Sequence, residues 1–598
     1  MVYTDENYQK RSLMRKLRPL LVGLCIALLV SPIFAVSNQQ KIYSLDSDIY
    51  EAIQILYVSQ GLSLPSTTGP YSQAELTLML EKLKPETLKG SLSSTYDFVV
   101  QQLNIEPNIQ GKGIGLSWNF DANLETYYHT DTTNFVGRET WTRGSLQQKP
   151  LLNIGLETWP AESFYGYSEF SVGNVPTLAT PFGSTMISSN VIVVPPAATS
   201  DIDLNFPYRT FVAGGGDHWT FQLGRDRLNW GAGTTGNLML SDTFKYHNMA
   251  RVTTFSDKFK YTFVTSFFPH PQNFFDSSGA SLTGHGQQDP VDGLHMFMSH
   301  RLEWRMLADR LGLTVTESVM YHHVDGELDL RVLNPAMFFH NYYIRNNANS
   351  ILGLEMDYTP VRNINIYGQL AIDEFAIPGL EPIPSETSEG FPLAFGYLAG
   401  VKGIVPMQKR VGYGSLEFAY TDPYLYLRYS NTSDPSSSDH DQYGLNYVGY
   451  IREFTGRGVD YHARPLGYTY GNDALVVNLN AGMKVFGKWN VTANIFYMAH
   501  GTFDLFTIWR QTGGSSGGLV STPTSDGSDS IGNYNDSTYA SRNAVSHTLV
   551  AGINGSYQLS DCLSVFGQVD YITIKNYKNK SGDSAGDIQL TFGATYSL

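Results

Sequence analysis

Residues 588–598 read IQLTFGATYSL, and every second residue in this stretch is apolar or aromatic, up to and including the final leucine. Successive side chains of a β-strand point to opposite faces, so a period of two indicates a strand with one apolar and one polar face. The pattern runs to Leu598 itself. We therefore expect the chain to end inside a strand rather than in a polar tail.

The same alternation recurs along most of the chain. Clear examples are residues 116–124, 259–267, 352–358, 475–485 and 489–497. We count roughly 16 to 20 such segments of about ten residues, the length that a tilted strand needs to cross a bilayer. Many begin or end with Tyr, Trp or Phe, as an interfacial aromatic girdle requires. The composition agrees, because only 16% of the residues are charged, against a usual value of about 25%.

A soluble β-sandwich or β-propeller would also give each strand one apolar face. However, these strands are long for a sandwich, and the chain shows no fixed-period repeat of the kind that propeller blades produce. In hydrocarbon every backbone N–H and C=O group needs a partner within the protein, which excludes an open sheet edge. The sequence therefore predicts an all-β transmembrane antiparallel β-barrel over residues 111–598, closed by its last strand and placed in the bacterial outer membrane.

The first 37 residues have the pattern of an export signal. Basic residues precede a short apolar run at positions 20–30, and the small residues Ala35 and Ser37 follow it. The apolar run is too short to span a membrane as a helix, so we predict a secretory signal peptide over residues 1–37. Beyond it Cys562 is the only cysteine, so no disulfide within the chain is expected.

A helical period replaces the strand period between the signal and the barrel. Apolar residues recur at helical spacing in three segments, residues 48–61, 72–83 and 86–103. Ser72 and Glu75 form a capping-box pattern, and Gly61 is placed to end the first helix. The sequence predicts a small helical bundle over residues 38–110, located in the periplasm and placed to plug the periplasmic mouth of the barrel.

If the apolar positions of each strand face lipid, the alternate positions face the lumen. Residues assigned to the lumen in this way are Arg301, Glu303, Arg305, Glu355, Asp357, Tyr367, Gln369, Asp373, Asn478, Asn480 and Lys484, and Tyr424, Tyr426 and Arg428 share one parity. Two interpretations stay open. Opposite charges can pair across strands and hold a large barrel rigid. Alternatively, aromatic faces pack on sugar rings while amides, carboxylates and guanidiniums hydrogen-bond sugar hydroxyls.

Two charged residues break the alternation. Glu317 shares its parity with Val315 and Val319, and Arg225 shares its parity with Leu223. A charge that faces lipid is costly, so we expect a bulge or a hairpin end near each of them.

Residues 231–236 read GAGTTG, a literal G-x-G-x-x-G. A dinucleotide-binding loop needs a helix directly after these glycines, and the chain continues instead into another alternating strand. We therefore assign no nucleotide to them. The glycines are expected to let the backbone turn tightly beside Trp230, at the barrel rim or in a loop folded inward.

Several short motifs occur in a fixed order. They are GRD at 224–226, WGAG at 230–233, NLMLS at 237–241, LNP at 333–335, FFH at 338–340, NSILG at 349–353, YGQ at 367–369 and IDEF at 372–375. Together with the helical head, they resemble the Wzi-like capsule-assembly outer-membrane proteins. The resemblance implies a small periplasmic helical bundle and a barrel of about 18 strands. It also implies a non-enzymatic protein that binds and retains capsular or other exported polysaccharide.

The candidate polysaccharide-binding residues combine these motifs with the lumen-facing set. They are Arg225, Asp226, Arg227, Trp230, Arg301, Glu303, Arg305, Tyr367, Gln369, Asp373, Tyr424, Tyr426 and Arg428. The expected partners are surface polysaccharide and outer-membrane lipid, with the protein a monomer. No cofactor is expected. The 14 histidines are scattered without close ligand spacing, so no metal site is expected, and the net charge of −15 argues against nucleic acid.

Two alternatives from other classes stay open. A porin or gated channel for small polar solutes needs the same polar lumen. An outer-membrane hydrolase needs a nucleophile and a base, for which Ser318, His300, His322 and His323 are the candidates. No G-x-S-x-G context supports them, and adjacent histidines on a strand point to opposite faces. Long loops rich in Ser, Gly, Asp and Thr at residues 275–293, 432–442 and 512–543, and a further loop with Pro and Glu at residues 381–390, are expected outside the cell.

Overall fold

The computed structural model describes residues 38–111, 114–135, 142–143, 147–174, 179–180, 183–184, 187–190, 202–203, 208–269, 294–323, 328–335, 348–375, 394–427, 445–455, 458–505, 522–525 and 542–598. The predicted signal peptide, Arg428 and nearly all of the predicted outer loops lie outside these residues.

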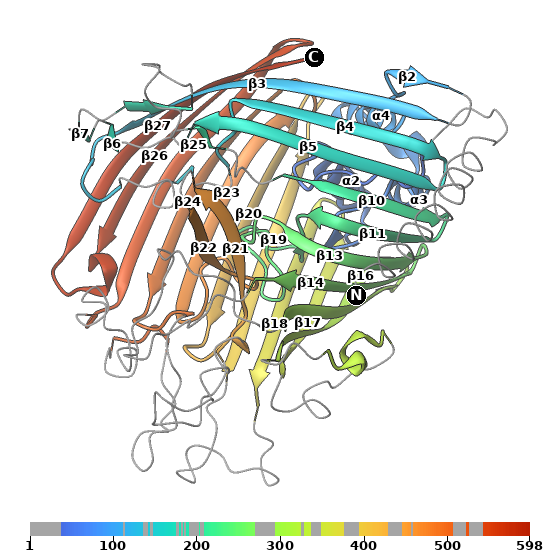
Figure 1. Ribbon diagram of the computed structural model, residues 1–598. Coiled ribbons are helices and arrows are strands. Elements are labelled where there is room, and N and C mark those ends of the chain that lie inside the picture. The colour runs from blue at the N-terminus through green and yellow to red at the C-terminus, as the bar shows by residue number, and fades with distance from the viewer. Residues whose placement is uncertain are drawn as a thin grey trace, which may run out of the picture.

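Eighteen long strands in the described residues form one closed antiparallel barrel (Figure 1). Closure is made by the last strand, β27, which pairs with the first, β3, from Gln589 opposite His129 to Ser597 opposite Asp121. The predicted fold class is therefore confirmed. The barrel strands are β3 (Gly115–His129), β4 (Leu152–Ala161), β5 (Phe164–Asn174), β10 (Thr210–Gly216), β11 (Trp219–Asp226), β13 (His247–Phe255), β14 (Phe259–Phe268), β15 (Leu294–Met306), β16 (Leu311–His323), β17 (Ala348–Val361), β18 (Ile364–Glu374), β19 (Ala394–Pro406), β20 (Val411–Thr421), β23 (Ala474–Val485), β24 (Trp489–His500), β25 (Ser546–Ser560), β26 (Leu563–Lys575) and β27 (Ser584–Ser597).

The two faces of the barrel wall differ as the alternation predicts. On β17, Leu354 and Met356 are 40% and 45% exposed on the outer face, whereas Glu355 and Asp357 between them are 8% and 5% exposed. The outer face is thus an apolar band and the inner face is polar. At one end of the barrel, alternate strands are joined by connections of only two to four residues, from 162–163 to 561–562. We call this the short-turn end.

Three helices form a head between residues 38 and 108. They are α2 (Asp48–Gln60), α3 (Gln73–Glu81) and α4 (Ser91–Leu103), with a 3-10 turn η1 (Pro85–Thr87) where the third predicted segment begins. Gly61 ends α2 in the left-handed conformation with φ 84°, and the Ser72 hydroxyl accepts from Glu75 N at 3.3 Å. None of the helices in the described residues is long and apolar enough to cross a membrane.

The head lies inside the short-turn end of the barrel. Its backbone bonds directly to the short turns: Asn363 N donates to Val58 O at 2.9 Å, and Ser63 N donates to Asp309 O at 2.8 Å. On the next turn, Ser91 N donates to Met407 O at 3.1 Å. The head therefore covers part of this mouth rather than hanging from it as a separate domain.

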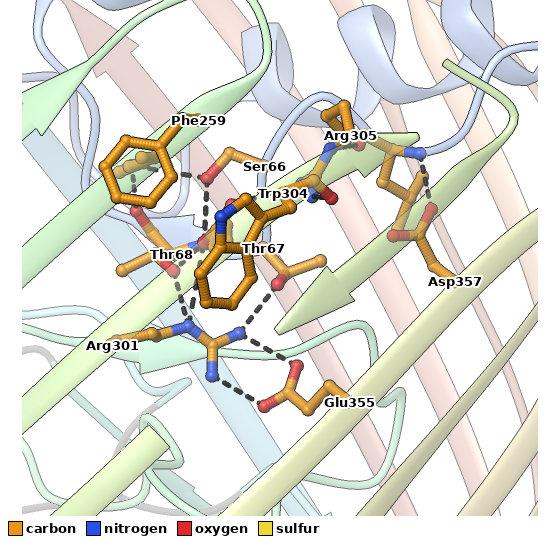
Figure 2. A network of polar contacts seen from close by, with 12 residues as sticks. Ser66, Thr67, Thr68, Phe259, Arg301, Trp304, Arg305, Glu355 and Asp357 are labelled. Atoms are coloured by element: carbon orange, nitrogen blue, oxygen red, sulfur yellow. Dashed lines mark hydrogen bonds and ion pairs between the residues drawn. The ribbon is translucent and has the colours of Figure 1, made fainter. Parts of the chain in front are cut away.

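Buried charges fix the head to the wall (Figure 2). Arg301 on β15 is fully buried and makes a bidentate ion pair with Glu355 on β17, at 2.7 and 2.8 Å. The same guanidinium donates to the hydroxyls of Thr67 and Thr68 in the head, at 2.7 and 2.6 Å. Nη1 also donates to Thr316 Oγ1 on β16 at 3.0 Å, so the partners of Arg301 lie on three separate segments.

The neighbouring charges repeat this arrangement. Arg305 Nε donates to Leu64 O at 2.7 Å, and Asp357 accepts from Leu64 N at 2.6 Å, so one head residue is held from both sides. Lys260 on β14 pairs with Glu75 of α3. Because the Glu75 carboxylate bonds to Lys260 of the wall, only one bond of the predicted capping box is present, the one from Glu75 N to the Ser72 hydroxyl.

A second segment, residues 227–246, fills the lumen from within. It leaves the far end of β11, turns inward and meets the head, where β12 (Asn229–Trp230) pairs with β1 (Thr68–Gly69). We call residues 227–246 the inward segment. Gly231 (φ 136°) and Gly236 (φ 121°) lie in it, and a Cβ on Gly231 would stand 2.2 Å from Gln369 Nε2. The G-x-G-x-x-G pattern is therefore a loop folded inward, whose glycines allow close approach.

A third segment, residues 445–470, packs on the inward segment. It contains the hairpin of β21 (Val448–Thr455) and β22 (Gly458–Pro465), which Figure 1 shows within the barrel outline. Tyr447 Oη donates to Met239 O at 2.6 Å, and Ser241 N donates to Leu466 O at 2.8 Å. Apolar residues of these segments form a hydrophobic core inside the lumen, which includes Trp230, Leu238, Met239, Leu240, Phe244, Tyr447, Leu466 and Tyr468.

Two predictions from strand parity are wrong. Tyr424 and Tyr426 do not lie on a strand, because β20 ends at Thr421 and a turn follows, with Tyr426 at φ 73°. Glu317 does not sit at a bulge, because the register of β16 is continuous with both neighbours. Its outer face is instead covered by residues 328–335, whose Val332 packs against Val319. The carboxylate accepts from Ser350 Oγ at 3.0 Å.

We predict that Glu355→Ala destabilises the protein by about 3–5 kcal/mol, since it leaves a buried guanidinium uncompensated. Unfolding in guanidinium chloride, followed by tryptophan fluorescence in detergent, measures the loss. Asp329→Asn removes the exposed Asp329–Arg331 pair and serves as the control, with no measurable change expected. A loss at Glu355 no larger than in this control would contradict the role assigned to the network.

We also predict a pH dependence at the opposite end of the barrel. Burial raises the pKa of Asp473 to about 7, although the carboxylate accepts from Phe503 N and Thr524 N at 3.1 and 2.9 Å. Its folded pKa lies above the ordinary value of about 3.9. The stability that Asp473 contributes is therefore complete below pH ~4 and is lost as pH rises through ~7.

Hydrogen exchange of residues 501–505, corrected for the intrinsic rate, should therefore be faster at pH 8 than at pH 5. Asp473→Asn keeps a residue that tolerates the left-handed φ of 53° and cannot ionise. We expect the variant to lose the pH dependence. An unchanged dependence in Asp473→Asn would assign the effect to another group.

Candidate functional site

A large cavity remains in the lumen beside the inward segment. We call it the central cavity; its volume is about 870 Å³, within the range of about 300–1,000 Å³ that is usual for ligand sites. Residues 44–46 of the head, the inner faces of β3, β4 and β5, and residues 234–236 and 242–245 of the inward segment line it. The cavity therefore exists because the inserted segments fill the barrel off-centre.

A cluster of paired polar side chains in the cavity surrounds Arg209, just before β10. Its guanidinium pairs with Asp226 at 2.7 Å and lies 4.9 Å from the ring centre of Tyr167. Tyr167 Oη donates to Glu169 at 3.2 Å. Burial disfavours the charged form of Arg209, but the Asp226 carboxylate outweighs it and holds the pKa of Arg209 above its ordinary value. The cluster thus offers a fixed positive charge, a carboxylate and an aromatic face.

Arg227 joins the head to the inward segment at the cavity floor. Its guanidinium pairs with Asp46 of the head at 2.9 Å and with Asp242 of the inward segment at 2.7 Å. Asp226 beside it accepts from Gln222 Nε2 at 2.8 Å and from the Arg227 backbone N–H at 2.9 Å. These two residues are the members of the predicted site that line the cavity.

A basic pair faces them across the cavity. Arg143 pairs with Glu125 at 2.6 Å and stacks on Phe566 at 4.3 Å. Lys149 Nζ donates to Thr595 Oγ1 at 3.2 Å. Burial within the barrel lowers the pKa of Lys149, and the nearby Glu125 carboxylate partly offsets this. The cavity is therefore lined by charges of both signs, and most of them are paired with each other.

Most of the other predicted site residues are buried in structural contacts. Arg301, Glu303 and Arg305 hold the head, as described above. Tyr367 Oη donates to Glu417 at 2.7 Å, and Gln369 bonds Asn237 and the Leu238 N–H. Asp373 accepts from Tyr426 N, and Tyr426 Oη donates to Leu238 O, both at 2.6 Å. These side chains hold the inward segment, so the rigid-lumen interpretation describes them better than sugar contact does.

The remaining predicted residues are dispersed. Trp230 is fully buried in the lumen core, and Tyr424 packs edge-on against Phe503. Arg225 lies on the outer face, between the rings of Tyr208 and Tyr246, at 4.6 and 4.3 Å. It sits next to the end of β11, where the chain leaves the sheet for the inward segment rather than forming the expected bulge or hairpin end, and its guanidinium stacks on the two rings.

Sequence reasoning missed Tyr167, Glu169 and Arg209. Tyr167 and Glu169 share the inward parity of β5, opposite the exposed Phe170, which was a usable signal. Arg209 stands before its strand, where no parity applies. Its importance follows only from the pairing of β10 with β5 and β11, which places it over Tyr167 and beside Asp226.

Of the hydrolase candidates, Ser318 and His300 lie on opposite faces of the wall. Ser318 Oγ faces the lumen and lies 2.8 Å from Ser299 Oγ. His300 lies on the outer face of the wall, where its Nδ1 is 2.8 Å from Tyr261 Oη. Among the described residues no group of three or more His, Cys, Asp or Glu side chains could hold a metal ion; the acidic loop at 432–442 lies outside them.

No protein-family model and no curated protein matches the sequence. Among solved structures, the chain is similar to Wzi, an outer membrane protein involved in group 1 capsule assembly in Escherichia coli and described as a carbohydrate-binding β-barrel. The TM-score is 0.55 at 13% identity, over 93% of this chain and 98% of that chain. The outer membrane channel DcaP of Acinetobacter baumannii gives a TM-score of 0.35 at 10% identity, over 83% of this chain and 100% of DcaP. Identities this low show the fold alone, which is that of outer-membrane β-barrels.

We predict that Trp230 acts as a core residue rather than a ligand contact. Trp230→Ala should cost about 3–5 kcal/mol of unfolding free energy, as large-to-small core substitutions do. Trp230→Phe is the matched control, because Trp230 Nε1 has no hydrogen-bond partner in the described residues and its loss removes no bond. Guanidinium unfolding of both variants in detergent tests this. Equal stability of the alanine and phenylalanine variants would overturn the assignment.

Proposed function

We propose that this protein is a non-enzymatic outer-membrane barrel that binds a capsular or other surface polysaccharide and retains it at the membrane. The observation that carries the proposal is the central cavity, where aromatic rings and hydrogen-bonding groups of both charges line one space. Sugars need this combination, because a pyranose has apolar ring faces and a rim of hydroxyls.

The Arg209 cluster is the strongest part of the proposed site. Arg209 and Asp226 already fix each other at 2.7 Å, so neither must be ordered when a ligand binds. Tyr167 presents a ring beside them, and Tyr470 also lines the cavity. This preorganisation supports recognition of hydroxyls. The short motifs that occur in the same order as in the Wzi-like family support a polysaccharide as the ligand that carries these hydroxyls.

The orientation is part of the same proposal. Outer-membrane barrels carry short turns on the periplasmic side and longer loops outside. By this rule the head lies in the periplasm, and the inward segment descends from the outer side. We propose that the protein acts as a monomer, because the closed barrel completes its own sheet.

Retention is favoured over passage of solutes. Besides the head, the inward segment and residues 445–470 meet in a hydrophobic core inside the lumen. An open porin keeps an aqueous channel at this place. The channel alternative therefore requires these segments to move apart, whereas binding in the cavity does not.

We predict that Tyr167→Ala and Glu169→Gln each weaken polysaccharide binding about tenfold, which corresponds to about 1.4 kcal/mol. Both residues line the cavity. Purified full-length protein is first screened on a glycan array, and the affinity for the best glycan is then measured by titration calorimetry.

Cells that lack the protein should release polysaccharide into the medium.

Arg225→Gln is the matched control, because Arg225 belongs to the sequence motif but lies on the outer face. Its affinity should equal that of the unchanged protein. Loss of binding in Arg225→Gln alone would move the site away from the cavity. A large open conductance of the intact protein in planar bilayers would instead favour the channel.

A further inference from the structure

The head leaves one side of the short-turn mouth uncovered. Its ion pairs and hydrogen bonds reach from β4, where Lys41 pairs with Glu157, to β23, where Lys484 pairs with Glu51. In the described part of the chain, no ion pair or hydrogen bond joins the head to β25, β26 or β27.

A second cavity lies at this uncovered side. We call it the vestibule; its volume is about 360 Å³. It is lined by Asp48 of α2, by residues 484–490 around the β23–β24 turn and by inner positions of β25, β26 and β27. These residues belong to the short-turn end, so the vestibule faces that end of the barrel.

The vestibule and the central cavity share two lining residues. Arg143 and Lys149 line both. The two spaces therefore meet at a neck formed by these cations. Arg143 Nε at the neck is buried and has no hydrogen-bond partner within the described residues, and Nη2 of the same guanidinium bonds Glu125 at 2.6 Å.

The lining of the vestibule is rich in cations. It holds Arg143, Lys149, Lys484 and Lys488 and a single carboxylate, Asp48. Arg143 and Lys484 pair with Glu125 and Glu51, and Lys149 and Lys488 make no ion pair among the described residues. Aromatic and amide side chains accompany them: Phe566 lies under Arg143, and Asn490, Asn554 and Gln568 also line the space. Cations concentrated in a cleft with low-dielectric walls attract anions. The amides and the aromatic face suit sugar hydroxyls and rings.

We propose that the vestibule is a second binding site, continuous with the central cavity, that takes the carboxylate-bearing units of an acidic polysaccharide. This inference rests on the proposed function for the identity of the ligand as a glycan and adds its charge. A carboxylate at the neck accepts from Arg143 and Lys149, while neighbouring sugar units extend into the vestibule and the cavity.

The test compares a hexameric oligogalacturonate with its carboxyl-reduced, neutral counterpart. Both are titrated against full-length protein in detergent, at about 50 mM and about 300 mM NaCl, because salt screens exposed charges. We expect the acidic oligomer to bind at least about tenfold more tightly at low salt, with the preference shrinking at high salt.

The variant Lys149→Gln with Lys488→Gln removes two cations whose side chains make no ion pair among the described residues. It should weaken binding of the acidic oligomer about tenfold and leave the neutral oligomer unchanged. The matched control, Lys84→Gln with Lys409→Gln, makes the same charge change at the same end of the barrel but outside both cavities. Its affinity for the acidic oligomer should be unchanged.

The possible failures are distinguishable. Equal affinity for the two oligomers, with both sensitive to Tyr167→Ala, overturns the acidic-ligand inference and leaves the proposed function standing. No binding of either oligomer, nor of any glycan on the array, counts against the proposed function itself. A competition experiment adds inorganic phosphate at the same concentration of negative charges as the acidic oligomer. Displacement of that oligomer would show a site for small anions and would contradict the assignment to a glycan.

Discussion

An eighteen-stranded sheet encloses more space than its own inward side chains can fill, and the rest of this structure follows from that constraint. Three inserted segments occupy the lumen: the head, the inward segment and residues 445–470. Each carries backbone polar groups into an enclosed space, where every unpaired N–H or C=O group would be costly. The wall supplies the partners. Arg305 and Asp357 bond the two sides of Leu64. Gln369 bonds the N–H of Leu238, and Tyr426, in the turn after β20, bonds its carbonyl.

Charged residues suit this task better than apolar ones because they have direction. A buried ion pair contributes little net stability, since desolvation offsets the attraction between the charges. What it fixes is the position of the head. The planar guanidinium of Arg301 donates in set directions, which determine where Glu355, Thr67 and Thr68 lie. The charges inside the barrel therefore determine where the head sits, while the hydrophobic core around Trp230 supplies the favourable free energy of packing.

The same constraint explains what could be predicted from the sequence. The strands and their faces were predictable because lipid on one side imposes a strict period of two, and the helices of the head were predictable from caps and spacing. Inward-pointing residues such as Arg301 and Tyr367 could be identified, but not their partners, because contacts such as that between Gln369 and Asn237 join distant segments. Parity also misled where the chain leaves the sheet, at Tyr426, or where another segment covers the outer face, at Glu317.

The position of the candidate site follows from how the lumen is filled. The head reaches the wall from β4 to β23, and the inward segment bonds to β18 and β20 through Gln369 and Glu417. In the described residues, the central cavity and the vestibule lie on the side that runs from β24 through β27 and β3 to β11. In an open porin, polar wall residues around the whole lumen face water. Here the polar wall residues near the inserted segments form hydrogen bonds and ion pairs with those segments. Residues of the unfilled side, such as Arg209, Tyr167 and Lys149, are therefore the ones that can contact a ligand. A lumen-facing position is therefore not by itself evidence of a binding residue in a filled barrel; what matters is whether an inserted segment lies opposite it.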